Sequence, residues 1–116
     1  MIAYFAPDLA WAVRIKSTAE SLGISARPAR NSSMLQNLMA DPNLRALIVD
    51  LDDPDIALEL IRQARVQSSP IQILAYGPHI ARDALDAARA AGADSVLPRG
   101  AFHANLIDIL KQLDAS

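Results

Sequence analysis

Residues 46–54 read Ala-Leu-Ile-Val-Asp-Leu-Asp-Asp-Pro, and this stretch decides the fold. A short apolar run with β-branched members, followed by a turn signal, is typical of a strand that is buried on both faces. Asp50 then falls at the carboxyl end of the strand, which is the edge where open α/β sheets bind ligands. The stretch therefore predicts a central parallel strand, with Asp50 as the candidate functional residue.

Composition narrows the class of protein. The chain has 116 residues, of which 52% are hydrophobic and 21% are charged, so we expect one compact domain over residues 1–116. The absence of cysteine excludes a disulfide framework and a thiolate metal site. A net charge of −2 gives no basic face, so we expect no nucleic-acid binding by this domain alone. No apolar run approaches the roughly 18 residues that span a bilayer, and no signal peptide is visible, which indicates a cytoplasmic protein without membrane contact.

The rest of the chain alternates between strand and helix patterns. Apolar runs predict strands at 2–6, 24–29, 45–50, 71–76 and 94–97. Apolar residues at helical spacing, with capping residues at the ends, predict helices near 8–22, 31–39, 54–64, 79–91 and 102–113. Because the connections are short, this alternation predicts a doubly wound parallel sheet with helices on both faces.

The first helix is expected to begin at Asp8, whose side chain can cap the amides of the first turn. Residues at helical spacing predict its buried stripe: Leu9, Ala12, Val13, Lys16, Ala19 and Leu22. Trp11 lies beside this stripe, and we expect it to seal the edge of the core.

The acids after the central strand admit two interpretations. Asp52, Asp53 and Asp55 can ligate a cation, or they can cap the following helix and interact with its dipole, which is the commoner role. His79 and His103 stand without a serine or cysteine nucleophile beside them, and His79 is expected on the surface at a helix start. We therefore predict no proton-transfer site from either histidine.

Over nearly its full length the chain resembles the receiver domain of two-component response regulators. In that family the third strand ends in the aspartate that accepts the phosphoryl group, and a proline follows at the spacing of Asp50 and Pro54. Residues 91–97, Ala-Gly-Ala-Asp-Ser-Val-Leu, look like the family's run into the fifth strand. The resemblance implies a flavodoxin-like (βα)5 fold with the strand order 2-1-3-4-5.

Most other functional positions of the family differ in this chain. The acidic pair that holds Mg²⁺ at the end of the first strand falls on Ala6 and Pro7. The hydroxyl at the end of the fourth strand falls on Ala75, and the aromatic residue that moves with it falls on Val96. The lysine after the fifth strand falls on Arg99, which keeps the charge and can fork onto a phosphate. The acceptor aspartate is the one position that is unchanged.

The resemblance therefore implies a signalling domain of a two-component or phosphorelay system rather than an enzyme. We expect a pseudo-receiver that needs no cofactor and binds a protein partner, or a second copy, through residues 79–113 (His79 to Leu113). In this interpretation Asp50 is a strand-end acid that nearby amides or Arg99 hold in place.

Two alternatives remain open. The first is a working but atypical receiver that is phosphorylated on Asp50, with Asp8, Asp50 and Asp52 around Mg²⁺ and Arg99 on the phosphate. The second is a small-molecule-binding flavodoxin-like module, although residues 6–8 lack the Ser, Thr and Gly that cradle a phosphate.

Overall fold

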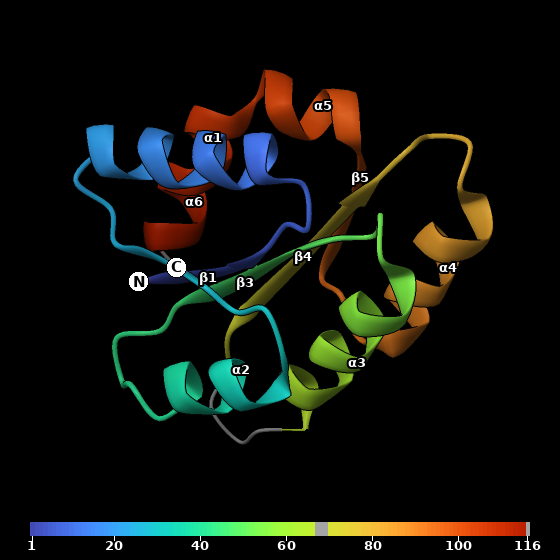
Figure 1. Cartoon of the computed structure of the whole chain (residues 1–116), viewed down its shortest axis with the longest axis horizontal. Coiled ribbons are helices and arrows are strands. Elements are labelled where there is room, and N and C mark those ends of the chain that lie inside the picture. The colour runs from blue at the N-terminus through green and yellow to red at the C-terminus, as the bar shows by residue number, and fades with distance from the viewer. Residues whose placement is uncertain (67–69, 116) are drawn as a thin grey trace.

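The structure of the chain, a computed structural model, describes residues 1–66 and 70–115. Its centre is a five-stranded parallel sheet in the order β2-β1-β3-β4-β5 (Figure 1). The strands are β1 Ile2–Phe5, β2 Ala26–Pro28, β3 Ala46–Asp50, β4 Gln72–Gly77 and β5 Ser95–Pro98. The sheet and its strand order confirm the doubly wound fold that the sequence predicts.

Helices cover both faces of the sheet. Along the described chain they are α1 Leu9–Ser21, α2 Ser32–Met39, α3 Pro54–Arg65, α4 Arg82–Ala91, α5 Arg99–Ala104 and α6 Leu106–Ala115. In Figure 1, α1, α5 and α6 lie on one face, and α2, α3 and α4 lie on the other. Within residues 1–66 and 70–115, none of these helices is long and apolar enough to cross a membrane.

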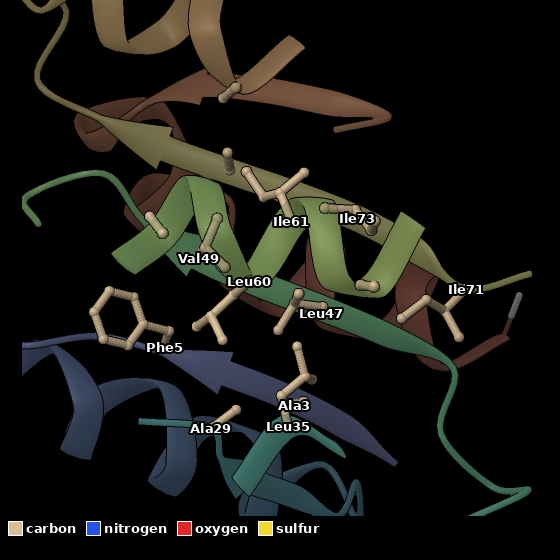
Figure 2. Close-up of a cluster of buried hydrophobic side chains, with 14 of the residues drawn as sticks. Ala3, Phe5, Ala29, Leu35, Leu47, Val49, Leu60, Ile61, Ile71 and Ile73 are labelled. Carbon is tan, nitrogen blue, oxygen red and sulfur yellow. The ribbon is translucent and has the colours of Figure 1, made fainter. Parts of the chain in front are cut away.

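The central strand β3 is buried along its whole length because helices pack on both of its faces. Leu47 and Val49 belong to a hydrophobic cluster under α3, where they lie beside Leu60 and Ile61 (Figure 2). Ile48 belongs to the cluster on the opposite face of the sheet. This two-sided burial explains why the strand reads as a continuous apolar run instead of an alternating one.

The C-terminal helix predicted at 102–113 is in fact two helices. α5 ends at Ala104 and α6 begins at Leu106, because Asn105 between them has a non-helical backbone with φ −113° and ψ 20°. The Asn105 side chain donates a hydrogen bond to the Ala101 carbonyl at 2.8 Å, and such local bonds compete with a continuous helix. Arg99, which was expected in a loop, is the first residue of α5.

The helix predicted at 79–91 begins later, at Arg82. A turn precedes it, in which the Ala81 amide donates to the Pro78 carbonyl at 2.9 Å. His79 is exposed in this turn, so its surface position is as predicted but its place at a helix start is not.

The buried face of α1 matches the predicted stripe only in part: Ala19 is buried and Ala12 and Leu22 pack against the core, but Leu9, Val13 and Lys16 are exposed. Ile15 is fully buried, whereas Leu9 is 75% exposed and Val13 is 57% exposed. The predicted stripe passes through Lys16, whose charge would be costly to bury, while a stripe centred on Ile15 presents apolar atoms to the sheet. Trp11 is half-buried at the edge of this face, as predicted.

Candidate functional site

The candidate site lies where β3 leaves the sheet. Asp50 is the last residue of β3, and none of its surface is exposed, although carboxylates are rarely buried unless they are paired. The chain turns directly after it: the Leu51 amide donates to the Tyr76 carbonyl of β4 at 2.8 Å, and α3 begins at Pro54. The fold therefore places a carboxylate inside the protein at the carboxyl edge of the sheet.

Asp50 is held by one amide and one guanidinium. Its Oδ1 accepts a hydrogen bond from the Asp52 backbone N–H at 2.8 Å and another from Arg99 Nη2 at 3.0 Å. The same Nη2 lies 3.1 Å from Asp52 Oδ1, so Arg99 bridges two carboxylates. Burial disfavours the charged guanidinium, but the hydrogen bonds and charges of Asp50 and Asp52 outweigh burial and raise the pKa of Arg99. We call this group, Asp50, Asp52 and Arg99, the clamp.

Tyr76 lies beneath the clamp on the neighbouring strand. It is paired with Asp50 in the register of β3 and β4, and its ring stacks on Phe102 with centroids 4.0 Å apart. Burial raises the pKa of the Tyr76 phenol, and the negative charge of Asp50 raises it further. Within the described residues, Asp50 Oδ2, the Tyr76 hydroxyl and Arg99 Nε are buried without a hydrogen-bond partner. Several polar atoms are therefore enclosed at one point of the fold.

His103 extends this group toward α1. It comes from α5 and is only 7% exposed, and its ring stacks on Trp11 with centroids 4.0 Å apart and an interplanar angle of 24°. The rings of Tyr76 and Phe102 lie nearly perpendicular to the same ring, with centroids 5.4 Å and 4.9 Å from its centroid. The sequence predicted no role for His103, because Trp11 and Tyr76 lie far from it in the chain. Two facts would have indicated these contacts: the register of β4 in the sheet, and which face of α1 is buried.

The end of β1 supplies no carboxylate to the site. Ala6 and Pro7 occupy the two positions where the resemblance implies an acidic pair. Asp8 is used as the N-cap of α1, where its Oδ1 accepts from the Ala10 amide at 2.8 Å. In the described part of the chain, no group of three or more His, Cys, Asp or Glu side chains is arranged to hold a metal ion. The structure thus brings Asp50 and Asp52 together with Arg99 but leaves Asp8 at a helix cap.

The other acids and the switch positions have structural places. Asp53 is the N-cap of α3, and Asp55 lies in the first turn of that helix, where a negative charge interacts well with the helix dipole. Ala75 is buried in the core cluster under α3, and Val96 packs against the same cluster. Neither position offers a hydroxyl or an aromatic ring to Asp50.

No family model matches the chain, and no curated protein matches it either. Solved structures do match over almost the whole chain, each below 25% sequence identity. The receiver domain of NtrX from Brucella abortus is 13% identical with a TM-score of 0.81, and the match covers 100% of this chain and 99% of that one.

Two further structures give the same picture. A response regulator from Thermotoga maritima is 16% identical with a TM-score of 0.78, over 99% of this chain and 97% of that one. A CheY-like receiver domain from Methylobacillus flagellatus is 22% identical with a TM-score of 0.73, over 97% of this chain and 96% of that one. The chain therefore has the fold of response regulator receiver domains.

Proposed function

We propose that this chain is a receiver-like signalling domain of a two-component or phosphorelay system that acts through contacts with protein, without Mg²⁺-dependent phosphorylation of Asp50. The observation that carries the proposal is the clamp. A phosphoryl acceptor has to present a carboxylate oxygen to its donor. Here Asp50 Oδ1 already accepts two hydrogen bonds, from Arg99 and the Asp52 amide, and Oδ2 is buried.

The residues around Asp50 do not fit a magnesium site. Mg²⁺ takes hard oxygen ligands in near-octahedral array, and carboxylates beside the acceptor are its usual protein ligands. Ala6 and Pro7 provide no side-chain oxygen, and the Asp8 carboxylate caps α1. Asp52 Oδ1 is within 3.1 Å of the Arg99 guanidinium, whose charge repels a cation. We therefore assign no cofactor to the domain.

A working but atypical receiver is the second candidate, and one observation favours it. Arg99 places a guanidinium beside the strand-end carboxylate, and such a group binds phosphate oxygens well. Incubation with Mg²⁺ and acetyl phosphate, followed by intact-mass measurement, distinguishes the two candidates. We expect no phosphoryl transfer to the protein, with a phosphorylatable receiver alongside to show that the donor is active.

The second arm of the experiment uses beryllofluoride, which mimics a phosphoryl group on a carboxylate. No change in the amide spectrum of the protein is expected on its addition. Stoichiometric phosphorylation that disappears in Asp50→Asn would overturn the proposal and establish the working receiver. The same modification in both the wild type and Asp50→Asn would place phosphate on another residue, which also contradicts it.

We propose residues 79–113 as the contact surface for a protein partner or a second copy. β5 is an edge strand of the sheet, and its Val96 and Leu97 are only half-buried. Ile80 before α4 is 79% exposed, and Ile107 on α6 is 52% exposed. We further propose a cytoplasmic domain that binds neither nucleic acid nor membrane by itself.

Light scattering after size exclusion tests the self-association arm. A dimer that dissociates in Ile80→Asp or Ile107→Asp supports this surface, with Leu9→Asp on the exposed face of α1 as the matched control. A dimer that only Leu9→Asp dissociates would place the surface elsewhere.

A further inference from the structure

His103 is enclosed by aromatic surfaces from two other elements. Trp11 of α1 covers one face of its ring, and Tyr76 of β4 meets the ring edge-on, as does Phe102 of its own helix. Within residues 1–66 and 70–115, neither ring nitrogen has a hydrogen-bond partner. A neutral imidazole fits such a site, whereas an imidazolium, with two N–H donors and a full charge, does not.

Charged groups around the ring reinforce this preference. Arg14 of α1 donates from Nη2 to the His103 carbonyl at 3.2 Å, and Arg99 lies at the start of the same helix. Burial lowers the pKa of His103, and the charges of Arg14 and Arg99 lower it further, while the charge of Asp50 opposes them. Asp50 is itself engaged by Arg99, so the balance of the surroundings disfavours a proton on His103.

A hollow beside His103 offers the ring a second position. It has a volume of about 340 Å³ and lies between α1 and the α5–α6 junction. Arg14 and Thr18 line it from α1, and Asn105 and Asp108 line it from the other side. Asp108 is an exposed acid of α6, and it is a suitable partner for an imidazolium that leaves the aromatic enclosure.

We propose that His103 is a proton-operated latch between α1 and α5. In the neutral form the imidazole stacks on Trp11 and joins the two helices. Protonation moves the ring into the hollow, toward Asp108, and breaks the stack. Because α5 begins at Arg99, release of the latch loosens the helix that carries the guanidinium of the clamp. Mild acid thus loosens the contact between α1 and α5 and, through Arg99, the ion pair of Asp50. This effect does not depend on phosphorylation of Asp50.

Trp11 is the one tryptophan of the chain, so its fluorescence reports directly on the stack. Between about pH 8 and about pH 5, we expect a reversible fluorescence change with a midpoint below about 6.5, the ordinary value for histidine. Far-UV circular dichroism should stay constant over the same range. His103→Phe keeps a neutral aromatic ring and should abolish the change, whereas His79→Gln, at the only other histidine, should retain it.

The wild type alone also tests the latch, by proton NMR titration of its two histidine rings. The His103 ring signals should titrate below about pH 6.5, the ordinary value for histidine, and together with the indole N–H of Trp11. Replacement of the acid in Asp108→Asn should lower the midpoint by a few tenths of a pH unit. The latch is refuted by a fluorescence change that persists in His103→Phe, by His103 titrating above about pH 6.5, or by loss of circular dichroism at the same midpoint.

Discussion

Arg99→Ala removes the guanidinium from the clamp and leaves Asp50 with the Asp52 amide as its remaining hydrogen-bond donor among the described residues. Asp50 has no exposed surface, so its negative charge then stays buried without an opposite charge. Breaking a buried ion pair by removal of one partner costs about 3–5 kcal/mol. The Arg99 side chain is 24% exposed, so water partly screens the pair, and we expect a loss of about 3 kcal/mol in the free energy of unfolding.

Asp50→Asn should cost much less, because the amide oxygen can accept the same two hydrogen bonds and Arg99 keeps the Asp52 carboxylate as its opposite charge. We expect Asp50→Asn to lie within about 1 kcal/mol of the wild type. In the double variant, Arg99→Ala no longer strands a charge. The two substitutions together should therefore cost about 2 kcal/mol less than the sum of the single ones, which is a coupling expected for residues in direct contact.

Urea unfolding followed by circular dichroism measures all four proteins of this cycle. Arg89→Ala is the matched control, since Arg89 pairs with Asp86 at 3.0 Å one turn apart on the exposed face of α4. Exposed pairs contribute little, so Arg89→Ala should change the free energy of unfolding by about 0.5 kcal/mol or less. A cost for Arg99→Ala no larger than that for Arg89→Ala, or a cycle without coupling between Asp50 and Arg99, would show that the buried ion pair does not stabilise the fold.

Three further predictions concern the scaffold and the enclosed phenol. Gly92→Ala should lower the free energy of unfolding by about 2 kcal/mol, since φ is +120° and the added Cβ would lie 2.9 Å from Arg65 Cγ. Gly23 has φ +73° and open space around it, so Gly23→Ala should cost about half as much in the same urea assay. Leu60→Ala, in the cluster under α3, should cost about 3 kcal/mol, and a loss below about 1 kcal/mol would contradict the packing. The fold raises the pKa of Tyr76 above its ordinary value of 10.0, so the neutral phenol stabilises the protein below about pH 10 and this contribution is lost as the pH rises further. Tyrosinate absorbance should therefore show Tyr76 ionising only as the protein unfolds. Tyr76→Phe should remove that part of the absorbance change.

The features that could be predicted from the sequence are those that local chemistry determines. The apolar run before Asp50 is the central strand, because a strand between two helical layers has no polar face to show. Asp8 and Asn31 cap their helices through the side-chain oxygens that the sequence places there. Strand order followed from resemblance to a known fold, and the structure confirms it.

The errors arose where tertiary contacts choose between local options. Two stripes run along α1 at helical spacing, and only docking against the sheet selects the one that contains Ile15 over the one that contains Leu9. The interruption at Asn105 likewise reflects a choice between a straight helix and a side-chain bond to Ala101. Residue types alone do not decide such cases, because both options satisfy the same periodicity.

Only some residues of the candidate site could be predicted, because the others meet through tertiary contacts. Asp50 was identified because it follows the apolar run of the central strand, and Arg99 because the resemblance assigns a role to its position. Tyr76, His103 and Trp11 were not assigned to the site, since β4, α5 and α1 come together only when the sheet is formed. The signal for Tyr76 lies in the register, which sets it opposite Asp50, and register is a property of paired strands.

The burial of Asp50 explains why it is paired with Arg99, since the end of β1 carries Ala6 and Pro7 and no charged side chain. A fully buried carboxylate requires a positive group close by, and in this chain Arg99 at the start of α5 supplies it. A second carboxylate, Asp52, lies 3.1 Å from the same Nη2 nitrogen, so both acids hold Arg99 through one end of its guanidinium. The clamp thus joins two carboxylates to one guanidinium. Its state then depends on what moves α5, and the only buried titratable group of α5 in the described residues apart from Arg99 is His103.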